Sequence, residues 1–334
     1  MNSGEKRPGL TIRPYQALCV VCALGEGEAG PREERLKGIL EAVRERPDVP
    51  VALQCNAGDV YVYQDPGTED DTPEGREFNR KRDLDILAKL DLAPGSVLPA
   101  RTLFHLVLKT IPTVSGLCGY ETTTSDAWKG CPRAGSGCYE KGRQKGIQAF
   151  IATRTEEEMG EEKKRSLQAM YEADAIAIRP HILLCAVCQY GGGTRPPFDP
   201  DNLPEFIQHI LADPDTPVTM AEAADWMMCA PCPNRVPELN ACVNVLGSGG
   251  LSNQKRDLDT LQALGLRYGG TMKARDLYRL IFEKIPTTRQ ICRRENRLPS
   301  VWWDGCGENN DKNAGGNEQY AKGREMLKKE FGLG

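Results

Sequence analysis

The chain has 334 residues, a net charge of −4 at pH 7 and a pI of about 5.7. It therefore has no basic footprint for nucleic acid, and its longest wholly apolar stretch, 17–24, is far shorter than the ~18 residues of a membrane span. Because the N-terminal residues also lack the apolar core of a signal peptide, we expect a cytoplasmic protein without nucleic-acid or membrane partners.

Hydrophobic spacing in the first half predicts mainly helices. A helix is expected over 33–46, where Leu36, Leu40 and Val43 recur on one helical face. The apolar run that leads into Cys19 is too short for periodicity to separate a buried strand from a buried helical turn. Four further elements are predicted in chain order: a strand over 49–53, a helix that carries Leu84, Leu87 and Leu90 on one face, a helix over 100–110 and a helix from about 139.

The second half repeats this order of elements. Its opening apolar run leads into Cys185 and has the same ambiguity between strand and helix. The charged stretch between the halves, 155–174, is expected to be a solvated helical linker. The pattern as a whole indicates a helix-rich α+β protein. The other elements expected in chain order are a helix over 203–212, a strand over 216–220, a helix capped by Ser252 that carries Leu258, Leu261 and Leu264, a helix over 274–284 that Pro286 ends, and a helix from about 320.

The thirteen cysteines fall into a pattern that occurs twice. Cys19 and Cys22 follow an Arg-Pro dipeptide at the same spacing as Cys185 and Cys188 do. Thiols stay reduced in the cytoplasm, and an odd count fits poorly with disulfide pairing alone, so the cysteines indicate metal binding or redox chemistry. The chain has only three histidines, which leaves little material for imidazole-based metal catalysis.

Other residues match between the halves in the same order. The run Lys-Arg-Asp-Leu-Asp at 81–85 recurs at 255–259. These ordered matches predict a tandem duplication of one cysteine-containing domain, with a first repeat over 1–154, the linker over 155–174 and a second repeat over 175–334. A pseudo-twofold arrangement of the repeats is compatible with this duplication. The later matches are Ile111 with Ile285, Cys118 with Cys292, Trp128 with Trp303, Cys131 with Cys306, and Tyr139 with Tyr320.

The cysteines can be grouped in two ways, and the first grouping follows the repeat. Four thiolates suit either a [4Fe-4S] cluster or a structural zinc ion. Apolar residues flank both Cys-x-x-Cys pairs, and the other two cysteines of each set are separated by 12 or 13 residues. Because an apolar shell protects a cluster, this grouping favours two [4Fe-4S] clusters, with zinc as the alternative. The two sets are Cys19, Cys22, Cys118 and Cys131 in the first repeat, and Cys185, Cys188, Cys292 and Cys306 in the second.

The second grouping is local to the second half. Cys229, Cys232 and Cys242 have no counterparts in the first half. If the segments ending at Cys185 and Met220 were neighbouring parallel strands, both cysteine pairs would follow strand ends at one edge of the sheet. Cys229, Cys232 and Cys242 would then be metal ligands together with Cys185.

The second half also carries a motif of a known domain. Residues 179–185 read Arg-Pro-His-Ile-Leu-Leu-Cys, and Cys-Ala-Pro-Cys at 229–232 and an Arg-Asp dipeptide at 256–257 follow. Over about residues 179–295 this resembles a small uncharacterised domain of bacteria and archaea that opens Arg-Pro-His-His-Leu-Leu-Cys. The resemblance implies an iron–sulfur cluster bound through cysteines and no particular activity. Ile182 and Cys188 depart from the pattern of that domain.

These observations predict an iron–sulfur protein with two clusters that transfers electrons or serves as the redox subunit of a partner protein. One alternative is an enzyme whose cluster acts directly on a small substrate, since the unequal cysteine content of the halves would allow one catalytic site. Another is an interaction module that Cys₄ zinc sites stabilise. The sequence indicates neither a substrate nor an oligomeric state.

Overall fold

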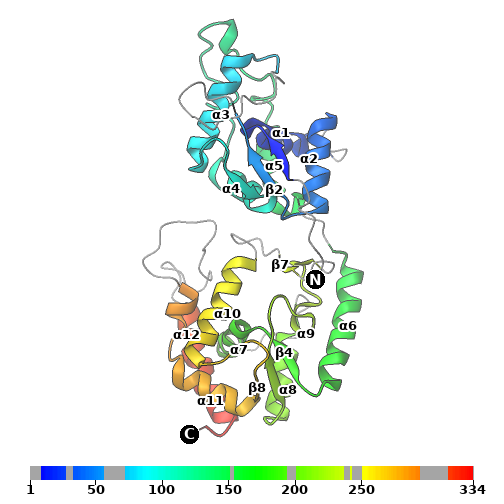
Figure 1. Ribbon diagram of the computed structural model, residues 1–334, viewed down its shortest axis with the longest axis vertical. Helices are drawn as coiled ribbons and strands as arrows, with labels where there is room; N and C mark the ends of the chain where they lie inside the picture. The colour runs from blue at the N-terminus through cyan, green and yellow to red at the C-terminus, as the bar shows by residue number, and fades with distance from the viewer. Residues whose placement is uncertain are drawn as a thin grey trace. The chain divides into compact units, whose positions relative to one another are not determined.

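The computed structural model describes residues 9–27, 33–55, 72–150, 154–193, 201–236, 241–242, 250–293 and 315–333 (Figure 1). The chain divides into two compact units, Met1–Ala152 and Thr153–Gly334. Each unit combines several helices with a small mixed sheet, so the helix-rich α+β architecture expected from the sequence is confirmed.

The sheet of the first unit has the strand order β1-β2-β3. β1 (Leu10–Ile12) runs parallel to β2 (Pro50–Leu53), and β3 (Val97–Pro99) runs antiparallel to β2. A parallel pair needs a crossover connection, which the two helices between β1 and β2 supply. Val51 and Leu53 of the central strand are completely buried, so this small sheet contributes directly to the core.

Helices form most of the first unit. Pro14 occupies the first position of the first helix, where its missing N–H group costs no hydrogen bond. The helix that precedes β2 buries Leu36, Leu40 and Val43, as its spacing predicts. In chain order these helices are α1 (Pro14–Gly25), α2 (Glu34–Glu45), α3 (Arg76–Leu90), α4 (Ala100–Thr110), the 3₁₀ turn η2 (Asp126–Trp128), α5 (Cys138–Gln144) and the 3₁₀ turn η3 (Ile147–Phe150).

The second unit has a sheet of the same kind. β4 (Ile176–Ile178) runs parallel to β5 (Pro217–Met220), and β8 (Thr271–Lys273) runs antiparallel to β5. A separate antiparallel pair joins β6 (Arg235–Val236) to β7 (Ala241–Cys242). The helices are α6 (Glu156–Glu172), α7 (Pro180–Gly191), α8 (Leu203–Ala212), α9 (Trp226–Cys229), α10 (Gly250–Leu264), α11 (Ala274–Lys284), the π-helical turn η5 (Arg289–Arg293) and α12 (Gly315–Glu330).

Several predicted elements agree with the structure, but the predicted face is wrong at one residue in each of two helices, and α10 begins at Gly250, before the Ser252 expected to cap it. The helices α4, α8 and α11 span the residues expected for them, and the two ambiguous runs with the Cys-x-x-Cys pairs are helical. Leu84 and Leu258 were expected to share a buried face with later leucines, but they are 39% and 50% exposed. A step of three residues turns about 60° short of a full helical turn, so such a row drifts off the buried face.

The charged stretch that the sequence analysis assigned to a linker forms α6 and belongs to the second unit. Its Met170 is completely buried. Lys163 forms an ion pair with Glu205 of α8 at 2.8 Å, and the indole N–H of Trp226 donates to Glu162 at 2.6 Å. These contacts pack one face of α6 against α8 and α9, and the rest of the helix is largely solvated.

In each unit a glycine allows two helices to pack in close contact. A Cβ on Gly142 of α5 would lie 1.9 Å from the backbone oxygen of Val21 in α1. A Cβ on Gly323 of α12 would lie 2.0 Å from the backbone oxygen of Val187 in α7. Only glycine fits at such distances, so these residues hold the helices with the Cys-x-x-Cys pairs tightly against the last helix of their unit.

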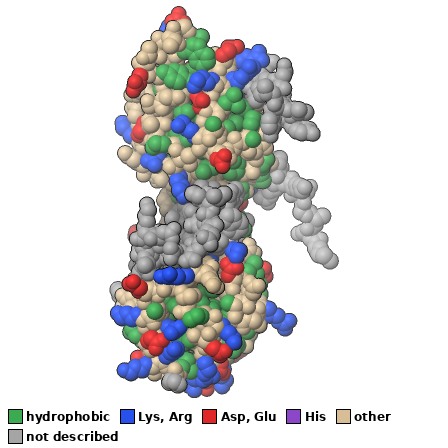
Figure 2. Space-filling model, turned by 90° about the vertical axis from the view of Figure 1, so that its left-hand side faces the viewer, with side chains coloured by type: hydrophobic (Ala, Val, Ile, Leu, Met, Phe, Trp, Pro, Cys, Tyr) green, Lys and Arg blue, Asp and Glu red, His purple; other side chains and the backbone are tan. Residues whose placement is uncertain are grey.

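Within the described parts of the chain, no helix is both long and apolar enough to cross a membrane. On the face that Figure 2 shows, Lys and Arg side chains are interspersed with Asp and Glu in both units. No broad region of one sign of charge occurs among the described residues of that face.

Candidate functional site

The four cysteines of the first repeat set line one cavity of about 300 Å³: Cys19, Cys22, Cys118 and Cys131. Two of them lie three residues apart on α1 and therefore on the same side of that helix. The other two belong to the long loop between α4 and α5. The sequence analysis grouped these residues only because they repeat, and the structure brings all four together.

Backbone hydrogen bonds close the loop that carries the second cysteine pair. The N–H of Cys118 donates to the carbonyl of Val114 at 2.9 Å, and the N–H of Cys131 donates to the carbonyl of Cys118 at 2.7 Å. Gly130 has a φ of +80°, and a Cβ there would lie 2.7 Å from the backbone oxygen of Cys118. A glycine is therefore required at this position, because a side chain there would prevent the backbone of Cys131 from approaching that of Cys118.

The environment of these thiols favours their protonated form. Burial raises the pKa of Cys19 to about 12 and that of Cys118 to about 11. Burial also raises the pKa of Cys22 and of Cys131, and neighbouring thiols add to the effect at Cys22. The charge of Arg82 opposes the shift at Cys19 and Cys118, but burial dominates, so the site favours neutral thiols. A bound metal would stabilise them as thiolates.

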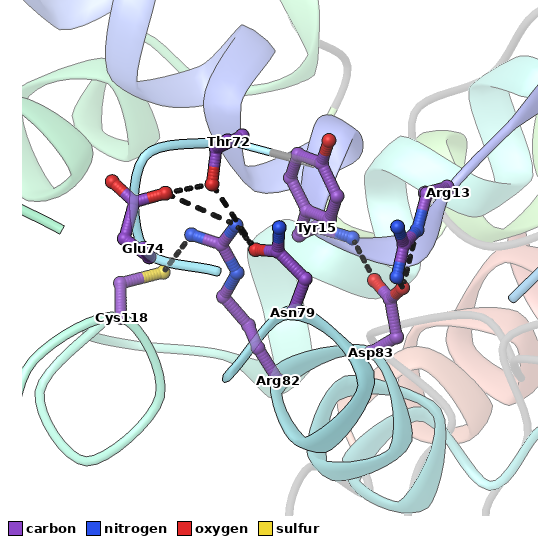
Figure 3. Close-up of polar contacts among 8 residues, drawn as sticks. All are labelled: Arg13, Tyr15, Thr72, Glu74, Asn79, Arg82, Asp83 and Cys118. Carbon is purple, nitrogen blue, oxygen red and sulfur yellow. Dashed lines mark hydrogen bonds and ion pairs between the residues drawn. The ribbon is translucent and has the colours of Figure 1, made fainter. Parts of the chain in front are cut away.

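A buried arginine of α3 lies in the wall of the same cavity (Figure 3). The side chain of Arg82 is 1% exposed, and its Nη1 donates to the Sγ of Cys118 at 4.0 Å. Its Nη2 donates to Oδ1 of Asn79 at 2.5 Å and lies 3.9 Å from the Glu74 carboxylate. Its guanidinium also lies 4.2 Å from the centre of the Tyr15 ring. Arg82 is visible in the sequence only as part of the repeated run 81–85, and no pattern marks Asn79 or Glu74.

A second buried ion pair fixes the start of α1 to α3. The Nε of Arg13 donates to Oδ2 of Asp83 at 2.8 Å, and the N–H of Tyr15 donates to Oδ1 of the same carboxylate at 2.9 Å. Arg13 and Asp83 are both almost completely buried. Because Arg82 and Asp83 are adjacent on α3, this anchor also fixes the position of Arg82 beside the thiols.

The second unit places its described cysteines on matching elements. Cys185 and Cys188 lie on α7, and Cys292 lies in the turn η5 after α11. Cys306, the predicted fourth ligand, lies outside the described residues. The structure therefore places three members of the second repeat set.

A buried tyrosine accompanies each of these cysteine groups. The hydroxyl of Tyr139 donates to the carbonyl of Ile111, and the hydroxyl of Tyr320 donates to the carbonyl of Ile285, both at 2.8 Å. Burial raises the pKa of each tyrosine, and two nearby cysteine thiols contribute in each unit. Those thiols are Cys22 and Cys118 for the first tyrosine, and Cys188 and Cys292 for the second.

The ion-pair anchor also recurs in the second unit. The Nε of Arg179 donates to Oδ2 of Asp257 at 2.8 Å, and the N–H of His181 donates to Oδ1 at 3.0 Å. Arg256 donates to Oδ1 of Asn253 at 2.6 Å, as Arg82 does to its own asparagine. The repeated Arg-Asp dipeptide was noted in the sequence as a match between the halves and, at 256–257, as part of the resemblance to the small prokaryotic domain. Its repetition could have indicated these buried contacts.

The strand pairing behind the second cysteine grouping is wrong. Residues 183–185 lie inside α7, and the parallel partner of β5 is β4, which precedes that helix. The helix starts here because Pro180 follows the extended Arg179. The pair at Cys185 and Cys188 therefore lies on a helix that follows β4, and the pair at Cys229 and Cys232 lies at the end of α9, which follows β5.

The three local cysteines of the second unit nevertheless lie near one another. The N–H of Cys232 donates to the carbonyl of Cys229 at 3.0 Å, and the β6–β7 pairing places Cys242 opposite Arg235. Burial raises the pKa of Cys229 strongly, and the neighbouring Asp225, Cys232 and Cys242 raise it further. The structure thus associates these three thiols with each other.

Within the described residues, no three His, Cys, Asp or Glu side chains are arranged to hold a single metal ion. The four thiols of the first unit line one cavity.

Comparison with known proteins gives no match: no protein-family model matches the chain, and no curated protein or solved structure matches it. The resemblance of residues 179–295 to a small prokaryotic domain thus stays a prediction.

Proposed function

We propose that this protein binds iron–sulfur clusters through its cysteines, one [4Fe-4S] cluster in each unit, and that it acts in electron transfer or as a redox subunit of a partner protein. The observation that carries the proposal is the cavity of about 300 Å³ lined by Cys19, Cys22, Cys118 and Cys131. Four cysteine thiolates are the usual ligands of such a cluster.

The surroundings of the first site support a cluster over a single zinc ion. The thiols are distributed around a cavity, and apolar residues such as Leu18, Leu36 and Val114 also line it. An apolar, largely buried shell limits the access of water and tunes the reduction potential of a cluster. A buried cation, Arg82, faces the same space and complements the negative charge of a thiolate-bound cluster.

We further infer that the two units arose by duplication of one domain. They share the strand order, the parallel and antiparallel pairings and the Arg–Asp anchor between the first and third of their matched helices. In each unit a tyrosine hydroxyl donates a hydrogen bond to the carbonyl of an isoleucine that precedes a proline. Each unit also has a close contact between two helices at their glycines. The second cluster is accordingly assigned to Cys185, Cys188, Cys292 and Cys306.

A second candidate function concerns only the local cysteines of the second unit. Cys229 and Cys232 form a tight turn near Cys242, which is the kind of short Cys-x-x-Cys loop that structural zinc sites use. In this alternative the protein is an interaction module that zinc stabilises. Metal analysis separates it from the first proposal because zinc has a filled d shell and gives no visible spectrum.

The test is metal analysis of the full chain purified without oxygen, together with a visible spectrum. We expect roughly eight irons and as many sulfides per chain, and about half of each in the Cys118→Ser variant. Cys55→Ala is the matched control, because Cys55 is buried in the same unit but does not line the cavity. Zinc without iron, or an unchanged iron content in Cys118→Ser, would contradict the proposal.

A further inference from the structure

Among the described residues, the charge of Arg82 is incompletely balanced. The closest carboxylate oxygen in this part of the chain, on Glu74, is 3.9 Å away, and the 2.5 Å hydrogen bond of Arg82 goes to the neutral amide of Asn79. Among the residues that the structure describes, its Nε has no hydrogen-bond partner. A buried cation that lacks close anionic partners is costly, so this site is arranged for additional negative charge.

The cavity is where that negative charge would lie. Arg82 donates to Cys118, and both side chains line the cavity with the other three thiols. The aromatic rings of Tyr15 and Phe78 lie 4.2 and 5.2 Å from the guanidinium and restrict where it can move. The adjacent Asp83 cannot compensate Arg82 fully, because it is engaged by Arg13 at 2.7 Å.

We propose that Arg82 is the positioning residue that sets the charge balance of the first cysteine site and raises the reduction potential of the cluster bound there, an inference that rests on the proposed function. Glu74 acts in the opposite direction. The guanidinium favours the more negative, reduced form of the cluster, and the nearby carboxylate disfavours it.

A cluster held by Cys19, Cys22, Cys118 and Cys131 would supply one-electron chemistry, with a reduced viologen as the one-electron donor. No bond of Arg82 would break and no proton would be transferred. The guanidinium stays charged throughout and would face one additional negative charge.

The experiment is a redox titration of the full chain, followed by visible and electron paramagnetic resonance spectra, for three variants. Arg82→Met removes the charge at similar length, Arg82→Lys keeps it, and Glu74→Gln removes the opposing charge. We expect Arg82→Met to lower one of the two reduction potentials by at least about 59 mV. For one electron this equals a tenfold decrease of the equilibrium constant for reduction. Arg82→Lys should change that potential by less than half as much, and Glu74→Gln should raise it.

Opposite shifts from Arg82→Met and Glu74→Gln are the result that a merely structural role does not produce. The inference is overturned if Arg82→Met binds iron as wild type does and leaves both potentials unchanged, or if Glu74→Gln fails to raise a potential. If Arg82→Met does not bind iron, the other two variants test the inference. A raised potential in Glu74→Gln with a small change in Arg82→Lys supports it, and an unchanged potential in Glu74→Gln overturns it. Wild-type protein without iron and sulfide would remove the proposed function itself, before any variant is compared.

Discussion

Tyr15 of the first unit and His181 of the second occupy matching positions, but their side chains interact differently with the adjacent aspartate. Both donate a backbone N–H to it, at 2.9 and 3.0 Å. The ring of Tyr15 stacks against Arg82, whereas Nδ1 of His181 lies 2.6 Å from Oδ1 of Asp257. The same backbone framework therefore surrounds its cysteines with different electrostatics.

The consequence appears in the two anchoring carboxylates. Burial raises the pKa of Asp83 to about 6, although Arg13 opposes the shift. Burial also acts on Asp257, but the hydrogen bonds of His181 and the charge of Arg179 outweigh it and lower the pKa. Two ion pairs of similar geometry thus have carboxylates whose pKa values shift in opposite directions, and the histidine in place of tyrosine is one difference between their surroundings.

The largest effect expected is the loss of either anchor. Asp83→Ala leaves Arg13 buried without its carboxylate, and Asp257→Ala does the same to Arg179, so each should destabilise its own unit by about 3–5 kcal/mol. Hydrogen exchange measured in increasing urea reports each unit separately.

Asp85→Ala is the control for the anchor variants, because its pair with Lys81 is partly exposed and should contribute only about 0.3–0.5 kcal/mol. If the anchor variants cost no more than this control, or if each variant destabilises both units equally, the assignment of one anchor to each unit is wrong.

A smaller effect is expected at the close helix contacts. Gly142→Ala and Gly323→Ala should each force two helices apart and cost about 1–3 kcal/mol, with loss of iron from the affected unit only. Gly160→Ala on α6 has no atom near its new Cβ and should stabilise the protein by roughly 0.5–1 kcal/mol. Thermal unfolding measures the expected loss of stability in the first two variants and the gain in the third, and iron analysis measures cluster loss. Equal effects at all three glycines would argue against the contacts.

The finest test of the comparison is the pH dependence of the two anchors. Because the pKa of Asp83 is raised from 3.8 to about 6, the part of the stability that arises from this pKa shift is present below pH 3.8 and is lost as the pH rises through about 6. The lowered pKa of Asp257 gives the reverse: its contribution is present above pH 3.8 and is lost as the pH falls through the folded-state pKa.

Carbon-13 NMR of the side-chain carboxyls measures both titrations in one sample. We expect Asp83 to titrate near pH 6 and Asp257 below 3.8. His181→Tyr should move Asp257 toward the behaviour of Asp83. Coincident titrations in the wild-type chain would show that the residue at this position does not control the carboxylate.

Much of the fold could be predicted because it depends on local periodicity. The apolar spacing of 33–46 and 203–212 and the Ile-Pro stops at 111 and 285 locate helices within a residue or two. The helices with the Cys-x-x-Cys pairs could not be told from strands, because they are apolar on every side and show no period. Leu84 and Leu258 were misplaced because a three-residue spacing does not follow one helical face.

The sequence by itself determined which cysteines belong together in the first unit, because a repeated order of residues is visible without any structure. Only the tertiary structure decided that Cys118 and Cys131 meet through a backbone hydrogen bond, and that Arg82, Asn79 and Glu74 lie beside the thiols. The physical reason is that helical periodicity and repeats are local properties of a chain. The approach of a loop, a helix and a buried cation to one cavity depends on packing between residues far apart in sequence.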